Sequence, residues 1–146
     1  LGSNLRMSEV SAAIGTIQLS HLDSWVGRRR EIAEIYHQAF ADHPLLDTPK
    51  VRPGAKHAWH QYCLATEYPD ELVAHLDQHG IDARRYYVTL CHQQNVFAKH
   101  PQHGQVLPVT ATLSSSLVAI PVMHELRDDE IERIIAAVMS FSVLQH

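Results

Sequence analysis

Apolar residues recur at helical spacing along the first 40 residues, and they divide into two stretches. Ser8 is a suitable N-cap for a first helix, because Glu9 follows it in the first turn, where the helix dipole favours an acidic side chain. The apolar positions of this helix are Met7, Val10, Ile14, Ile17, Leu19 and Leu22. They occupy more than one side of the helix, so we expect a neighbouring structure to cover it.

A second helix is predicted from Asp23 or Ser24 to Phe40. Its apolar stripe comprises Trp25, Ile32, Tyr36 and Phe40. The three arginines at 28–30 lie mostly off this stripe. Such a triplet is either an anion site or a solvated helix face, and we favour the solvated face because basic runs on helices usually have that role.

The next segment, 42–56, contains three prolines and Gly54, so it is expected to be neither a continuous helix nor a central strand. A strand is predicted over 59–66. Pro69 then suits the first position of a helix, and Gly80 suits the C′ position at the end of that helix.

The remaining pattern predicts a strand over 81–87 and an irregular segment over 88–106. A helix over 108–116 is expected to lead into a strand over 117–120, and Asp128 is expected to cap a final helix. The inward positions of that last helix are Ile131, Ile134, Ile135 and Val138. Short strands separated by helices, with long helices at both ends, predict an α+β layer structure.

Composition narrows the class of protein. A formal net charge of −4 gives no basic surface for nucleic acid or an anionic membrane. No apolar run approaches the ~20 residues that a membrane-spanning helix needs. Cys63 and Cys91 lack CxxC spacing and do not form a disulfide scaffold, which favours a cytoplasmic location.

Twelve histidines raise the question of a metal site. His75 and His79 are four residues apart and therefore share one helix face. Two ligands do not make a zinc site, and no HExxH motif or cysteine cluster supplies the others. We therefore expect surface histidines and no metal.

Several strings resemble the motifs of one enzyme family. The opening Gly2-Ser3-Asn4-Leu5-Arg6-Met7-Ser8-Glu9-Val10 is similar to the GxNxRM-(S/T)E signature of the DegT/StrS family of nucleotide-sugar aminotransferases, which depend on pyridoxal phosphate. Residues 29–36 resemble its RR-x-IA-x-x-Y string, and residues 59–62 its WHxY strand. Residues 69–72, 79–81 and 119–121 resemble its PDEL, GI and LP strings. The similarity covers nearly the whole chain, in order.

The resemblance implies a fold and a domain division. It implies the C-terminal small domain of a fold-type-I aminotransferase, with a small, mainly antiparallel sheet covered by helices and long N-terminal helices. Residues 1–42 are then a helical segment that links to a missing large domain, and residues 43–146 form the small α+β domain.

The resemblance also implies which cofactor residues this chain holds. The family's cofactor-binding lysine lies upstream of the opening string, whereas Lys50, Lys56 and Lys99 lie outside the family motifs. We therefore assign no catalytic residue and expect the chain alone to be inactive. The resemblance implies that Asn4 reaches across a dimer interface to the phosphate of the partner's cofactor, although an asparagine there also suits an Asx turn or a helix cap. Arg6 either pairs with a phosphate or holds the loop through a carboxylate.

Candidates for the substrate side come from the string Ala83-Arg84-Arg85-Tyr86-Tyr87. It departs from the family's commoner HYP version and resembles a subset that reads ARRYFYP…CH, with which Cys91-His92 agrees. We take Tyr86, Tyr87 and His92 as candidate contacts to sugar or base. The alternative is that the tyrosines only cover the sheet.

The function expected from the resemblance is the transfer of an amino group from an amino-acid donor to a keto-deoxysugar nucleotide, by a homodimer. The runner-up is a free-standing, non-catalytic module for dimerisation or sugar-nucleotide binding. The residues encoded before Leu1 distinguish the two.

Overall fold

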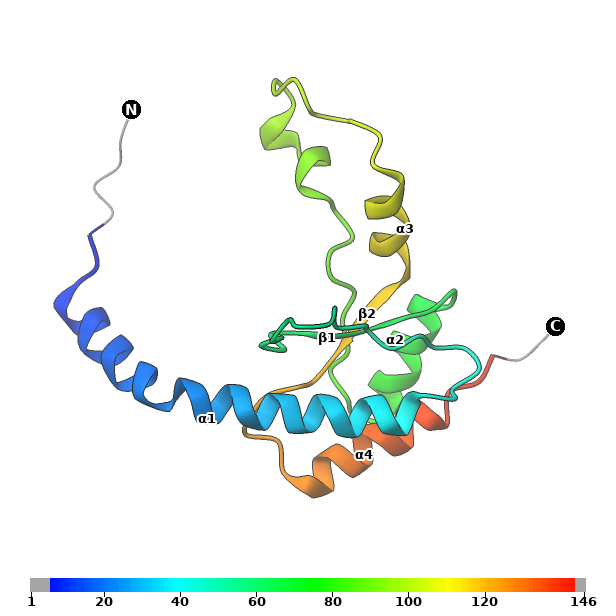
Figure 1. Cartoon of the computed structure of the whole chain (residues 1–146). Coiled ribbons are helices and arrows are strands. Elements are labelled where there is room, and N and C mark those ends of the chain that lie inside the picture. The colour runs from blue at the N-terminus through cyan, green and yellow to red at the C-terminus, as the bar shows by residue number, and fades with distance from the viewer. Residues whose placement is uncertain (1–5, 144–146) are drawn as a thin grey trace.

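The computed structural model of the chain describes residues 6–143. Its elements are α1 (Glu9–Phe40), β1 (Tyr62–Ala65), α2 (Pro69–Gln78), the short 3₁₀ helices η1 (Cys91–Gln93) and η2 (Asn95–Phe97), α3 (Pro108–Ser116), β2 (Leu117–Ile120) and α4 (Asp128–Met139). The predicted α+β class and the antiparallel sheet covered by helices are confirmed (Figure 1).

The two predicted N-terminal helices are one helix of 32 residues. The expected boundary at Asp23 and Ser24 was wrong because neither residue acts as a cap. The Ser24 hydroxyl instead donates to the His21 carbonyl oxygen at 2.7 Å, a bond that a continuous helix accommodates. The N-cap at Ser8 is confirmed, since its Oγ accepts from the Ser11 amide at 3.1 Å.

The hydrophobic core lies where the second half of α1 crosses α4 and the sheet (Figure 1). Its fully buried large side chains are Ile32, Tyr36, Phe40, Tyr62, Leu64, Leu72, Leu76, Val118 and Val138. Tyr36 stacks on Phe40 and donates its hydroxyl to the Pro121 carbonyl oxygen at 3.0 Å. Burial raises the pKa of Tyr36 above the usual range, so the phenol stays a neutral donor.

The sheet is an antiparallel pair in which Tyr62 faces Ile120 and Ala65 faces Leu117. The strand predicted over 81–87 is reduced to a single bridge. The Arg84 amide donates to the Ala119 carbonyl oxygen at 3.0 Å, and the Arg84 carbonyl oxygen accepts from the Ala119 amide at 2.8 Å. Pairing stops there because the chain turns at Tyr86 and Tyr87.

The strand predicted over 59–66 is shorter at its N-terminal end. Trp59 has a φ of 49°, a left-handed conformation that turns the backbone out of the extended path. The ring of Trp59 is buried against His57, His37 and Tyr62, and this packing holds the residue in place.

The ends of α2 and α4 follow from their sequences. Gly80 has a φ of 71° and donates to the Asp77 oxygen, while the Ile81 amide donates to the Leu76 oxygen, which makes the predicted C′ glycine a Schellman cap. Asp128 does not cap α4 but is its first residue. The Arg127 amide at the cap donates to the Glu130 carboxylate at 2.9 Å.

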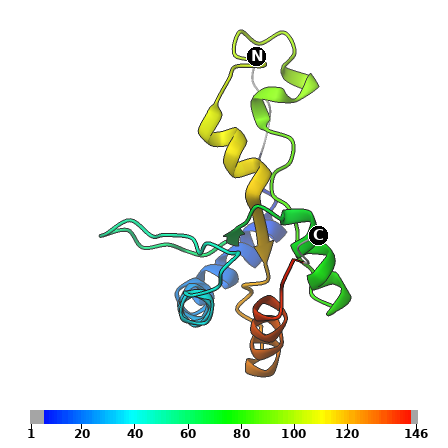
Figure 2. The same cartoon turned by 90° about the vertical axis from the view of Figure 1, so that its right-hand side faces the viewer.

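Three segments project from the core. The first half of α1 and the excursion from residue 86 to α3 are visible in Figure 1, and the irregular segment 47–60 extends sideways in Figure 2. The predicted irregular segment 88–106 carries only η1 and η2, and the helix predicted over 108–116 is α3. No residue of η1, η2 or α3 is buried.

Candidate functional site

Tyr86 and Tyr87 line a cavity of about 440 Å³ between the turn after Arg84 and α3, which we name the arm cavity. Its other walls are Thr89, Leu90, Cys91, Gln94, Thr110, Leu113, Ser114 and Leu117. The two tyrosine rings lie 5.1 Å apart between centroids. Tyr86 is half-buried and Tyr87 is exposed, so the cavity offers apolar walls lined by two tyrosine rings.

Residues of α2 and α3 hold the turn beside the arm cavity. The Ser114 hydroxyl of α3 donates to the Tyr87 carbonyl oxygen at 2.7 Å. Arg85 donates to the Asp70 carboxylate at 2.8 Å and to the Ser115 carbonyl oxygen at 3.1 Å. Arg85 therefore ties α2 to α3 directly beside the tyrosine pair, a charge-assisted contact that sets where the excursion leaves the core.

The structure places the predicted substrate residue His92 apart from the tyrosine pair. His92 lies in η1, half-buried, and its carbonyl oxygen accepts from the Gly104 amide at 3.1 Å. Its neighbour Cys91 lines the arm cavity, whereas His92 is not among the lining residues. The geometry thus brings together two of the three predicted substrate residues.

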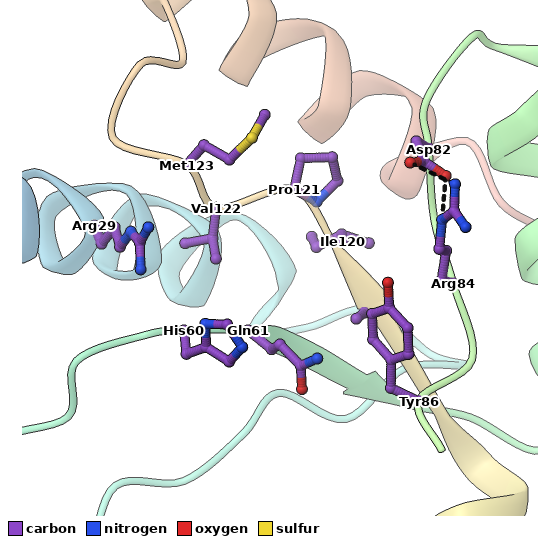
Figure 3. Close-up of a pocket in the computed structure, with 11 residues that line it drawn as sticks. Arg29, His60, Gln61, Asp82, Arg84, Tyr86, Ile120, Pro121, Val122 and Met123 are labelled. Atoms are coloured by element: carbon purple, nitrogen blue, oxygen red, sulfur yellow. Dashed lines mark hydrogen bonds and ion pairs between the residues drawn. The ribbon is translucent and has the colours of Figure 1, made fainter. Parts of the chain in front are cut away.

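A second cavity, of about 220 Å³, lies at the edge of the sheet, and we name it the sheet-edge cavity (Figure 3). Its lining residues are Arg29, His60, Gln61, Asp82, Arg84, Tyr86, Ala119, Ile120, Pro121, Val122 and Met123. Figure 3 shows Arg29 projecting from α1 at one end and Arg84 with Asp82 at the other. Tyr86 lines both cavities, so it forms the wall they share.

Two polar residues of the sheet-edge cavity were considered in the sequence analysis: Tyr86 as a substrate residue, and Arg29 in the triplet for which an anion site was the less favoured interpretation. Arg28 and Arg29 are half-buried, so the favoured solvated-face interpretation of the triplet holds only for Arg30, which is exposed. The basic triplet itself was the available signal. No sequence signal marks Gln61, because its place in the cavity depends on which face of the strand the fold leaves uncovered.

The predicted cofactor residues lie at the N-terminal end. Asn4 falls outside the described residues. Arg6 is exposed, two residues before the Ser8 cap of α1, and it lines neither of the two cavities. All three lysines are exposed as well.

The histidine pair has structural partners. His75 and His79 are 4.5 Å apart between ring centroids, but His75 Nε2 lies 2.9 Å from the Ala137 oxygen and His79 Nδ1 lies 2.8 Å from the His75 oxygen. In the described part of the chain, no group of three or more potential ligands is placed to hold a metal ion. Among residues 6–143, no helix is long and apolar enough to cross a bilayer.

Comparison with known proteins decides the family. The sequence profile of the DegT/DnrJ/EryC1/StrS aminotransferase family matches residues 1–139. The chain belongs to this family. A DegT/DnrJ/EryC1/StrS relative from Streptomyces venezuelae, a dTDP-3-amino-3,4,6-trideoxy-alpha-D-glucose transaminase, is 33% identical over 141 residues, which are 97% of this chain and 37% of that protein. A dTDP-3-amino-3,6-dideoxy-alpha-D-galactopyranose transaminase from Aneurinibacillus thermoaerophilus is 29% identical and matches 94% of this chain and 37% of its own length.

Solved structures of the DegT/DnrJ/EryC1/StrS family agree with the fold. The crystal structure of S. venezuelae DesV in complex with a ketimine intermediate superposes with a TM-score of 0.88 at 33% identity, over 94% of this chain and 37% of DesV. A family aminotransferase from Brucella abortus gives a TM-score of 0.84 at 30% identity, over 94% and 36% of the two chains. The chain therefore spans a little over a third of the length of these relatives, and its resemblance to the family is confirmed.

Proposed function

We propose that this chain is the C-terminal part of a pyridoxal-phosphate-dependent aminotransferase that transfers an amino group from an amino acid to a keto-deoxysugar nucleotide. The observation that carries the proposal is the family match over residues 1–139, which includes the turn where Tyr86 and Tyr87 line the arm cavity. Two of its relatives are named as transaminases of dTDP-linked aminodeoxysugars.

The residues of this chain fit one side of the cofactor only. Arg6 is an exposed cation next to the N-terminus of α1, where the helix dipole also favours an anion, so Asn4 and Arg6 suit the phosphate group. Attachment of the cofactor to a lysine requires a positioned, desolvated amine, and Lys50, Lys56 and Lys99 are all exposed. When bound, pyridoxal phosphate supplies the electron sink for the transfer.

Other contributions of this chain are binding and orientation. We assign Tyr86 and Tyr87 to the sugar nucleotide, with rings for stacking and hydroxyls for hydrogen bonds. His92 is assigned to the same substrate from the adjacent η1. The arm cavity, at about 440 Å³, falls within the usual range of small-molecule sites, roughly 300–1,000 Å³.

The assembly that we propose has two subunits. Residues 1–42 link to a large domain, residues 43–146 form the small domain, and Asn4 serves the cofactor of the partner subunit. The exposed apolar side chains of the first half of α1 support a covering partner for that half, because an uncovered apolar helix face is an aggregation liability. The second half of α1 packs in the core of the small domain. The free thiols Cys63 and Cys91 support a cytoplasmic location.

The test is an amino-transfer assay on the complete encoded protein with pyridoxal phosphate, a panel of amino acids and a dTDP-linked keto-deoxysugar. Formation of the aminosugar nucleotide is the expected result. Replacing Tyr87 by Phe removes one hydroxyl and should raise the KM for the sugar nucleotide roughly two- to tenfold, the usual net value of one hydrogen bond. Tyr68→Phe, away from both cavities, is the matched control. No product with any keto-deoxysugar nucleotide would refute the proposal.

The cross-subunit role of Asn4 has its own test. Asn4→Ala should weaken cofactor retention about ten- to a hundredfold, because the lost bond is to a charged acceptor and is worth about 1.5–3 kcal/mol. Mixed dimers of Asn4→Ala subunits with subunits that lack the cofactor-binding lysine should keep one active site, which combines that lysine with an intact Asn4 from the neighbour. Confirmed mixed dimers without activity would show that Asn4 serves its own subunit.

A further inference from the structure

The sheet-edge cavity contains a cation with an unsatisfied donor. Arg29 Nε is buried, and no protein acceptor lies within hydrogen-bonding distance of it among residues 6–143. A buried donor of a charged group that is left unpaired carries a desolvation cost. An acceptor supplied by a ligand would remove that cost.

Both neighbouring arginines have found partners. Arg28 donates to the Asp128 carboxylate at 2.6 Å, and Arg30 Nε donates to the His57 carbonyl oxygen at 2.9 Å. Arg29 is therefore the member of the triplet whose guanidinium faces the cavity instead of a protein acceptor.

The charges that line the cavity do not compensate Arg29. Asp82 is the single carboxylate among the lining residues, and Arg84 holds both of its oxygens, with Nε to Oδ1 at 2.9 Å and Nη2 to Oδ2 at 3.2 Å. With that pair neutral, the cavity keeps the positive charge of Arg29. A negatively charged guest is the complementary ligand.

The remaining walls suit an oxyanion. Figure 3 shows His60 and Gln61 at the start of β1 on one side and the Tyr86 ring on another. An imidazole, an amide and a phenol each provide a hydrogen-bond donor. Ile120, Pro121 and Val122 supply an apolar wall, which strengthens electrostatic attraction by lowering the local dielectric.

The size of the cavity limits what can enter. At about 220 Å³ it is smaller than the roughly 300–1,000 Å³ of sites that enclose drug-sized ligands. It therefore suits a small acid or one anionic group, and it is too small to enclose a whole sugar nucleotide.

We propose that the sheet-edge cavity binds a small oxyanion, a carboxylate or a phosphate, through Arg29, with His60, Gln61 and Tyr86 as further donors. The site lies outside the arm cavity assigned to the sugar nucleotide and shares only Tyr86 with it. Binding there requires no amino transfer, so the proposal can fail or hold independently of the proposed reaction.

The experiment follows the Arg29 Nε–H signal by NMR in the complete, cofactor-loaded protein. The signal is assigned by its loss in Arg29→Gln. Inorganic phosphate is titrated in one arm, and succinate, a small dicarboxylate, in the other. We expect a saturable shift of this signal in at least one arm, and the arm that produces it identifies the source of the oxyanion.

Variants establish that the contact is direct. Arg29→Gln should weaken binding of that probe at least tenfold, whereas Arg52→Gln should leave binding unchanged, because Arg52 is exposed and lines neither cavity. Arg29→Lys keeps the charge but removes Nε, and it should also weaken binding. It serves as the second variant if Arg29→Gln does not fold.

Two outcomes would overturn the proposal. An Arg29 signal that moves with neither probe means that no oxyanion binds there. Equal weakening in Arg29→Gln and Arg52→Gln means that the probes respond to overall charge. The amino-transfer assay with Tyr87→Phe has a different readout, so failure of the reaction and failure of this site are distinguishable.

Discussion

The two halves of α1 have the same kind of apolar stripe and opposite environments. In the second half, Ile32, Tyr36 and Phe40 are completely buried against α4 and the sheet. In the first half, Val10 and Ile17 are 69% and 64% exposed although they recur at the same spacing. Helical periodicity locates an apolar face, but only tertiary contacts decide whether that face is covered.

The transition between the halves occurs at a few contacts with α4 and the segment before it. The Trp25 ring stacks on His124 with centroids 4.6 Å apart, and Arg28 reaches Asp128 and the Leu126 carbonyl oxygen. N-terminal to Trp25 the side chains of α1 are exposed or nearly so. The helix thus changes from a core element to a projecting one within one or two turns.

The largest expected effect tests the core half. Phe40→Ala should reduce the free energy of unfolding of the 146-residue chain by about 3–5 kcal/mol, because it removes a fully buried ring and leaves a cavity. Leu19→Ala, at an exposed position of the same helix, should change it by less than about 0.5 kcal/mol. Urea unfolding measures both. Similar losses for the two variants would show that the halves are equally covered.

A smaller effect tests the contact between α1 and α4 where the buried half of α1 begins. Arg28 has a side chain 31% exposed and Asp128 one 85% exposed, so water screens much of their attraction. A double-mutant cycle with Arg28→Gln and Asp128→Asn should give a coupling energy of about 0.2–1 kcal/mol that falls as salt is added. A coupling that salt leaves unchanged would place the pair in a drier environment than the structure shows.

The smallest effect compares His43, a buried histidine just after the end of α1, with His21, an exposed histidine on the first half of α1. Burial lowers the pKa of His43, which follows α1 and stacks on Phe141, below the usual value near 6.5. The unfolded chain therefore binds more protons than the folded chain between these two pKa values. The free energy of unfolding that depends on neutral His43 is fully present above about pH 6.5, and it falls as the pH falls toward the pKa of His43 in the folded chain.

His43→Gln should therefore flatten the fall of the thermal midpoint between about pH 7 and the folded pKa of His43. His21→Gln, on the exposed half of α1, is the control and should leave that slope as in the original chain. A steeper slope in His43→Gln would mean that the folded state favours the charged imidazole.

Local sequence signals predicted most of the helix ends, but they did not predict that α1 is continuous or where strand pairing stops. Pro69 and Gly80 mark the limits of α2 because each fixes the backbone by its own chemistry. Asp23 and Ser24 have side-chain oxygens that can cap a helix, yet the contacts of Trp25 and Arg28 with distant residues keep the helix intact. The bridge at Arg84 was overextended into a strand, since alternation does not reveal where a partner strand ends.

For the site, the sequence grouped residues that are adjacent in the chain but not residues that the fold brings together. Tyr86 and Tyr87 are adjacent in sequence, so family motifs were sufficient to group them, and both line the arm cavity. Arg29 and Gln61 are 32 positions apart and meet only because α1 passes the start of β1. No local sequence pattern predicts that Arg29 and Gln61 lie close together.

The single bridge between Arg84 and Ala119 closes off the whole excursion that carries the arm cavity, since the chain leaves the core at one residue and returns at the other. The entropy of closing a loop grows only with the logarithm of its length, so doubling the excursion costs about 0.6 kcal/mol. We therefore expect insertions, deletions and substitutions in 88–106 to leave the register of β1 and β2 intact. Because of the bridge, the sequence of this segment can be changed to alter ligand preference without changing the core.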